Sequence, residues 1–204
     1  VVFSTFGENT LSTEAQDVLD AASFPVAQIG TVKYGTLNEA INAAVNGDVV
    51  TLLADNAENV TVTQKPDVKF TIDGADKTMT GTITIDGKSA AYATAGITIK
   101  NVKFDANNIA KDASINLGGN NSIRYTNGVT VDNCIFTGTG KAKVAVKNYT
   151  GGCKNVTITN CTATGLHSLA QLKTSTTVTL TNNTVSECKN GVSLGSSTGV
   201  TVTE

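Results

Sequence analysis

The sequence predicts an all-β parallel β-helix, a solenoid of three strands per turn, and three observations support this prediction. A short phrase of residues returns along the chain, with copies starting at Ile97, Val129, Val156, Val178 and Val200. The copies lie about 22 to 32 residues apart, a period typical of stacked repeats. Each copy alternates branched apolar residues with polar ones, as a half-buried strand does. An asparagine follows four of the copies and suits a left-handed corner.

The rest of each repeat supplies two more strands. Alternation resumes after the corner, and a glycine-containing break then leads to a third apolar run, so that each repeat reads as strand, corner, strand, loop, strand. We align the third strands at Val144, Ala170 and Val192. We interpret the corner residues as a hydrogen-bonded structural ladder made of Asn101, Asn133, Asn160 and Asn182.

The N-terminal third contains the predicted helices. Residues 1–30 do not repeat and form an arm, in which 12–22 has the pattern of a short helix. The stronger helix is 36–46, because Thr36 and Glu39 make a capping box and Gly47 suits the C-terminal cap. Its apolar face, which we expect to plug the first coil, comprises Leu37, Ala40, Ile41, Ala44 and Val45.

Residues 29–62, IGTVKYGTLNEAINAAVNGDVVTLLADNAENVTV, resemble the opening of pectate-lyase-like domains, which have the pectin lyase fold. The resemblance implies a right-handed parallel β-helix over 31–204, headed by the capping helix 36–46. It also implies a bacterial surface or secreted protein, outside the cell. The matching residues are Thr36, Leu37, Glu39, Ala40, Ile41, Ala44, Gly47, Asp48, Val50, Leu52 and Asn59. One fold carries many functions, so the resemblance specifies the architecture more strongly than the activity.

Charge and composition limit the classes of partner that we expect. The net charge is −2 and the pI about 5.4, which gives no electrostatic reason to expect nucleic acid. No apolar run reaches the ~20 residues of a membrane span, so we expect no membrane insertion. The chain stops just after VTVTE has begun another strand phrase, and we expect truncation there and homo-assembly through open β-helix ends.

The cysteines and acids indicate no metal and no cofactor. Four cysteines form no CxxC pair and accompany a single histidine, which disfavours zinc. Cys134 and Cys161 share a repeat position and should stack; we interpret them as small buried thiols, with a disulfide as the alternative. Asp73 and Asp86 each precede a glycine, and an ordinary turn explains both better than a calcium site.

A search for catalytic groups favours a role without catalysis. The one arginine, Arg124, and the one histidine, His167, lie outside the motifs that enzymes of this fold carry. Between 129 and 203 the only acids are Asp132 and Glu187, which fall at different repeat positions, whereas glycoside hydrolysis needs a pair of carboxylates.

Basic side chains provide the candidate ligand-binding residues. Lys141, His167 and Lys189 share one repeat position, and Lys147 and Lys173 share another, with Gln171 between them. Such rows suit an acidic glycan, although lysines on a strand's outer face also keep a solenoid soluble. The leading hypothesis is thus a non-catalytic extracellular module that binds a glycan or cell-surface ligand and acts in adhesion, as a stalk or in self-assembly. The alternatives are a polysaccharide lyase or hydrolase, and a carbohydrate-binding module for acidic glycans.

Overall fold

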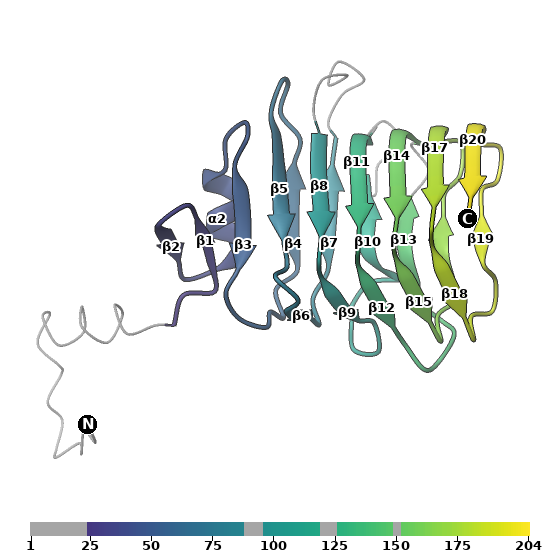
Figure 1. Ribbon diagram of the computed structural model, residues 1–204, viewed down its shortest axis with the longest axis horizontal. Helices are drawn as coiled ribbons and strands as arrows, with labels where there is room; N and C mark the ends of the chain where they lie inside the picture. Colours follow the sequence, from purple (N-terminus) through teal and green to yellow (C-terminus); the bar gives the residue numbers. More distant parts are fainter. Residues whose placement is uncertain (1–23, 88–95, 119–125, 149–151) are drawn as a thin grey trace, which may run out of the picture.

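The computed structural model describes residues 24–87, 96–118, 126–148 and 152–204, which form three sheets around one core (Figure 1). From β3 onward, every strand in these residues pairs in parallel with its equivalent in a neighbouring coil, as a β-helix requires. The arm's predicted helix at 12–22 lies outside the described residues. No helix in the described part of the chain is long and apolar enough to cross a membrane.

The strands divide among the sheets as follows. Sheet A contains, in spatial order, β2 (Val32–Tyr34), β1 (Ala27–Ile29), β3 (Val49–Leu52), β5 (Lys69–Asp73), β8 (Gly96–Lys100), β11 (Thr126–Asp132), β14 (Cys153–Thr159), β17 (Thr176–Thr181) and β20 (Thr198–Thr203). Sheet B contains β18 (Thr184–Ser186), β15 (Thr162–Thr164), β12 (Ile135–Thr137), β9 (Lys103–Asp105) and β6 (Thr78–Met79). Sheet C contains β19 (Val192–Ser193), β16 (Ser168–Gln171), β13 (Val144–Asn148), β10 (Ala113–Leu117), β7 (Ile83–Asp86) and β4 (Val60–Thr63).

The predicted register of sheet A is confirmed. Val129 pairs with both Ile97 and Val156, and the same register continues to Val178 and Val200. Their side chains point inward, while the threonines between them point outward, because successive residues of a strand face opposite sides. Sheet B is in register too: Phe136 pairs with Phe104 on one side and Ala163 on the other.

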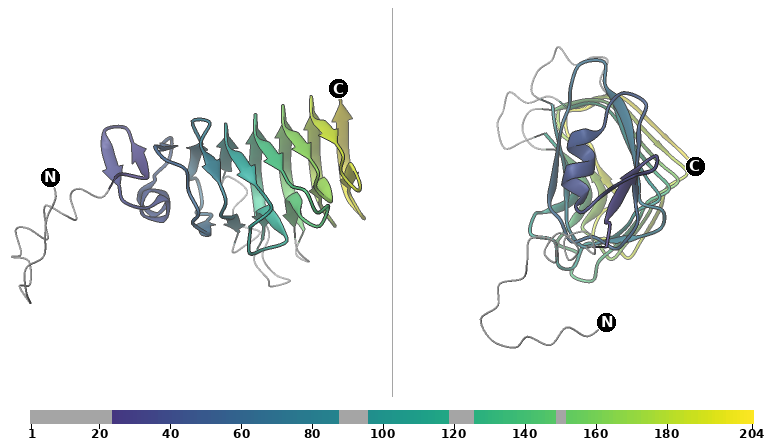
Figure 2. Two further views of the ribbon diagram at one scale, coloured as in Figure 1. Left: turned by 90° about the horizontal axis from the view of Figure 1, so that it is seen from below. Right: turned by 90° about the vertical axis from the view of Figure 1, so that its left-hand side faces the viewer.

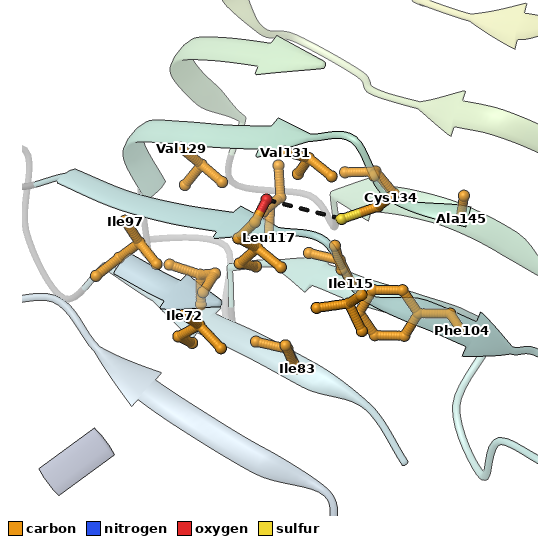
Figure 3. Packing of buried hydrophobic residues seen from close by; sticks show 14 of the residues in the cluster. Ile72, Ile83, Ile97, Phe104, Ile115, Leu117, Val129, Val131, Cys134 and Ala145 are labelled. Atoms are coloured by element: carbon orange, nitrogen blue, oxygen red, sulfur yellow. Dashed lines mark hydrogen bonds between the residues drawn. The ribbon is translucent and has the colours of Figure 1, made fainter. Parts of the chain in front are cut away.

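The core is a column of stacked apolar side chains. Figure 3 shows Ile97 and Val129 from successive coils on one wall, with Phe104 and Ile115 facing them from sheets B and C. Phe104 stacks on Phe136 with ring centroids 4.9 Å apart and the planes nearly parallel. Each fully buried side chain of this size stabilises the fold by roughly 1.5–3 kcal/mol, so burial in the column is the main force that holds the coils together.

Two lines of left-handed residues bound the strands of sheet A. At the downstream corner stand Asn101, Asn133, Asn160 and Asn182, with φ between 49° and 54°. A second line, which the sequence analysis missed, bends the upstream end and comprises Gly128, Asn155, Thr177 and Gly199, with φ between 53° and 65°. Glycine and asparagine tolerate this conformation, whereas a β-branched threonine is strained in it.

A short helix, α2 (Leu37–Ala43), covers the N-terminal end of the core, as the axial view in Figure 2 shows. Its capping box is present: Glu39 N–H donates to Thr36 Oγ1, and Thr36 N–H donates to a Glu39 carboxylate oxygen, both at 3.1 Å. Leu37, Ala40 and Ile41 are buried against the first coil. The predicted plug is therefore confirmed.

The end of this helix differs from the prediction. The helix stops at Ala43, with Ala44 as its C-terminal cap, rather than at 46. Gly47 is left-handed but lies in the following turn, where its N–H donates to the Lys69 carbonyl at 2.7 Å. Val45, assigned to the apolar face, is 62% exposed. The tight turn that sends the chain into β3 ends the helix early.

The β1–β2 hairpin precedes α2 and is antiparallel, unlike the coils. Gly30, with φ of 56°, supplies its turn. β1 also pairs antiparallel with β3 and so begins sheet A within the segment assigned to the arm. β1 has only three residues, which is too short for the alternation of apolar and polar residues to reveal a strand.

Candidate functional site

Candidate binding residues meet on the outer face of sheet C. Its side chains form one in-register row across six strands, because the strands pair in parallel. The row consists of Thr61, Thr84, Asn116, Lys147, Gln171 and Ser193. Thr84 is 6% exposed and Asn116 is fully buried, so these two interior positions of the row are covered. Thr61 at the end of the row is exposed, and Lys147 and Gln171 are partly exposed.

The predicted pairing of Lys147 with Lys173 is wrong. Lys147 lies beside Gln171, and the third strands align at Val146, Ala170 and Val192 rather than at Val144. The prediction was two residues out of register. Lys173 follows the end of β16, where its backbone is held by Asn148: Lys173 N–H donates to Asn148 Oδ1, and Asn148 Nδ2 donates to the Lys173 carbonyl, both at 2.7 Å.

Lys141 does not belong to the predicted row of Lys141, His167 and Lys189, because His167 lies beside Lys143. His167 N–H donates to the Lys143 carbonyl at 2.6 Å, and the His167 carbonyl accepts from Asn190 N–H at 2.7 Å. Lys141 is instead bonded through its N–H to the Gly165 carbonyl at 3.1 Å. The His167 ring contacts Ser168, with Nδ1 3.4 Å from the hydroxyl oxygen.

Three lysines lie in or contact the loop that leads into β10, and we call Lys111, Lys143 and Lys147 the lysine cluster. Lys143 Nζ donates to the carbonyls of Ile109, at 3.1 Å, and Lys111, at 2.9 Å. Lys147 Nζ forms an ion pair with Asp112 at 3.1 Å. Lys111 Nζ donates to Thr84 Oγ1 at 2.7 Å. Lys147 therefore pairs with the carboxylate, whereas Lys143 and Lys111 bind carbonyl and hydroxyl oxygens of the adjacent loop and strand.

Of this cluster only Lys147 was identified from sequence. Lys111 and Lys143 lie in loops without the repeat pattern. Lys111 and Lys143 each come just before the third strand of a coil, and this shared position could have identified them from the sequence. The side chain of Asp112 is 67% exposed and that of Lys147 is 21% exposed, so this ion pair is accessible to an acidic ligand.

A hollow of about 250 Å³ opens beside the cluster, between sheets B and C. Lys141 and Lys143 line it, together with Asn107, Thr139 and the backbone of Gly138. Thr139 N–H and its hydroxyl both donate to Asn107 Oδ1 at 2.9 Å, which fixes the rim. Lys141 therefore lies near the cluster, although it does not line up with His167 as predicted.

Acidic groups are sparse on this surface. Among the outward-facing residues of the six sheet C strands, the one carboxylate is Asp86, which is 5% exposed. Asp73 belongs to sheet A, where it pairs with Lys100 at 3.2 Å, so Asp73 and Asp86 do not face each other across coils. Although burial opposes the change, hydrogen bonds from Asn101, Ala75 and Lys100 lower the pKa of Asp73. Within the described residues, no group of three His, Cys, Asp or Glu side chains is arranged to hold a metal.

The four asparagine corners form two bonded pairs. Asn133 Nδ2 donates to Asn101 Oδ1 at 2.8 Å, and Asn182 Nδ2 donates to Asn160 Oδ1 at 3.4 Å. Between the pairs, Asn160 Nδ2 donates to Asp132 Oδ1 at 2.8 Å. Asn133, Asn160 and Asn182 are exposed, and Asn101 is partly exposed.

All four cysteines are free thiols. Cys134 and Cys161 are buried, and their neighbours Ile135 and Thr162 pair in register, which places the two thiols on adjacent coils. Cys134 Sγ donates to the Ile99 carbonyl at 3.7 Å, a bond drawn in Figure 3. The interaction with Cys161, together with burial, raises the pKa of the Cys134 thiol well above its ordinary value. Burial also raises the pKa of Cys153, to about 11.

Comparison with known proteins agrees with the architecture. A curated relative from Arabidopsis thaliana, named probable pectinesterase/pectinesterase inhibitor 23, is 40% identical over 96 residues, which is 43% of this chain and 17% of that protein. The chain thus covers only a small part of that relative's length. No solved structure matches the chain significantly. The family model described as the right-handed beta helix region matches residues 49–204. Since that match spans most of the chain and every coil of the three sheets, the protein belongs to the right-handed β-helix family.

Proposed function

We propose that this β-helix is a non-catalytic extracellular module that binds an acidic glycan through the lysine cluster and acts in adhesion. The observation that carries the proposal is the accessible ion pair of Lys147 with Asp112, with Lys111 in the same loop and Lys143 bonded to that loop. A ligand carboxylate can replace Asp112 at Lys147, because exposed ion pairs contribute only ~0.2–1 kcal/mol each.

The neighbouring surface supports binding of a chain rather than of a single ion. Lys147, Gln171 and Ser193 are partly exposed and lie in one row, so their polar groups repeat about every 4.8 Å along the solenoid axis. The relative named as a pectinesterase indicates an acidic plant polysaccharide as the first ligand to test. The resemblance to surface and secreted bacterial proteins supports a location outside the cell.

The test is binding of polygalacturonate, measured by calorimetry at several salt concentrations. The double variant Lys111→Gln, Lys147→Gln should lower affinity about tenfold and reduce the salt dependence, since two ion contacts are lost. Lys154→Gln removes an exposed lysine from sheet A and is the matched control. Equal affinities for the double variant and the control would refute the proposal.

Ester hydrolysis is a second candidate, favoured by the name of the Arabidopsis relative. It predicts release of methanol from methylated pectin, and the lyase alternative predicts unsaturated uronate absorbance. Either product, at a rate that scales with protein concentration, would replace the non-catalytic proposal.

Self-assembly is a separate proposal, supported by the apolar side chains on β20, where Val200 is 38% and Val202 is 64% exposed. For the 204-residue chain, light scattering should show an average molecular mass that increases with protein concentration. Val202→Lys should suppress the increase, because a charge on an edge strand opposes pairing. A concentration-independent monomer mass would reject this part.

A further inference from the structure

A second hollow, of about 480 Å³, lies on the outer face of sheet A, a different sheet from the one beside the lysine cluster. It spans the coils from β5 to β14 and is open to solvent. Its lining comprises Gly47, Asp48, Lys69, Phe70, Thr71, Gly96, Ile97, Thr98, Gly128, Thr130 and Asn155. This volume lies within the range of pockets that hold small ligands, roughly 300–1,000 Å³.

Two adjacent glycines create the hollow. Gly96 pairs with Lys69, and Gly128 and Asn155 occupy the same register on the next two coils. This outer row therefore carries side chains at Lys69 and Asn155 and none at the two glycines between them. Lys69 and Asn155 form the walls, and the backbone between them forms the floor.

The two glycines have different causes. Gly128 belongs to the left-handed line, with φ of 65°, so the bend of β11 requires it. Gly96 is not left-handed, and a Cβ there would meet only the flexible Lys69 Cγ, at 3.2 Å, and the Gly128 carbonyl oxygen, at 3.5 Å. Neither the backbone nor packing requires glycine at 96. A glycine within a strand also marks a place where a ligand approaches the backbone closely.

The lining suits a sugar. Thr71, Thr98 and Thr130 lie in one register row and present three hydroxyls along one side. The Asn155 amide is oriented by its donation to Asn127 Oδ1 at 2.8 Å, and the Asp48 carboxylate by accepting from Val45 N–H at 2.8 Å. A pyranose ring needs this combination of donors and acceptors around its hydroxyls and a flat floor beneath its C–H face.

We propose that the Gly96–Gly128 hollow is a saccharide-binding site that holds one or two sugar rings of a glycan, with the rings lying over the glycine backbone. Asn155 and the threonine hydroxyls bind the sugar hydroxyls, and Lys69 closes one end. The site is separate from the lysine cluster and does not depend on it.

The test titrates the 204-residue chain with cellobiose or digalacturonate and follows its amide chemical shifts by NMR. Either sugar should shift the amide signals of Gly96 and Gly128 saturably. Gly96→Thr fills the hollow and should lower affinity at least tenfold while the protein stays folded, because replacing glycine in a compatible conformation reduces the entropy of the unfolded chain.

Gly191→Thr is the matched control, since Gly191 is exposed, not left-handed and has no atom within 4 Å of an added Cβ. It should bind as wild type does. Lys147→Gln should leave the sugar-induced shifts of Gly96 and Gly128 unchanged while it weakens polygalacturonate binding, which separates this site from the lysine cluster. If neither sugar shifts the two glycine amides, or if Gly96→Thr binds as tightly as Gly191→Thr, the proposal is wrong.

Discussion

Glu58 holds Leu37: a Glu58 carboxylate oxygen accepts the backbone N–H of Leu37 at 2.8 Å, and the other oxygen accepts that of Asn38 at 3.1 Å. Glu58 lies in the first coil, whereas the two N–H groups belong to the first two residues of α2. Asn56 fixes the carboxylate by donating to it at 2.8 Å. A helix of only seven residues is marginal alone, so this bond and the buried face keep it in place.

Glu58→Ala should lower the free energy of unfolding by about 2 kcal/mol, because charge-assisted hydrogen bonds to two helix N–H groups are lost. Urea unfolding followed by circular dichroism measures the change. Thr36→Ala, which removes the local cap alone, should cost about 1 kcal/mol. Lys154→Ala serves as an exposed control. A loss at Glu58 no larger than at Lys154 would show that the link between helix and coil is not stabilising.

Thr177→Asn should stabilise the protein by about 1 kcal/mol. Thr177 has a φ of 59°, and the equivalent position on other coils is Gly128, Asn155 or Gly199. A left-handed β-branched residue is strained by ~1–2 kcal/mol, and asparagine relieves part of that strain. Thermal unfolding provides the measurement. The same substitution at Thr179, which is not left-handed, should destabilise, and a gain of equal size at both sites would rule out relief of strain.

Stability should fall in alkali through Cys153. Its pKa is raised by burial from the ordinary 9.0 to about 11, so the folded protein retains a proton that the unfolded chain releases. The stabilisation is complete below pH 9 and is lost as the pH rises to about 11, by roughly 3 kcal/mol in total. Denaturant unfolding from pH 7 to 11 tests this. Cys153→Ala should flatten the decline, and an unchanged slope would contradict the assignment.

Asp112→Asn should tighten polygalacturonate binding about threefold, since it removes a carboxylate that competes with the ligand for Lys147. Asp76→Asn makes the same charge change on the turn before β6 and should have little effect beyond the net charge. The comparison at two salt concentrations isolates the local contribution. Weaker binding by Asp112→Asn would mean that Asp112 positions Lys147 rather than competing with the ligand.

Sequence reasoning recovered sheet A because the phrases at Val129 and Val156 leave one register that matches both the corner and the apolar face. It failed at sheet C for a physical reason. A slip of two residues leaves every side chain on the same face, so alternation alone cannot distinguish Val144 from Val146 as the partner of Ala170. The loops before these strands differ in length, and only the folded chain shows how many residues they absorb.

The candidate sites were harder to predict than the sheets. Lys143 and Lys111 belong to loops, where no period predicts position. The hollow at Gly96 depends on a missing side chain between Lys69 and Asn155, and only the register across coils reveals that arrangement. Repeat periodicity thus predicts the scaffold, whereas irregular segments and absent side chains form the sites.

The two left-handed lines that bound sheet A set a rule for how such a chain can vary. Between Asn155 and Asn160, or Thr177 and Asn182, the number of residues is fixed, because both ends must meet their counterparts on the neighbouring coil. Insertions are tolerated only on the other two edges of the solenoid. New binding specificities can therefore arise there by lengthening a loop, while this wall stays constant through β11, β14 and β17.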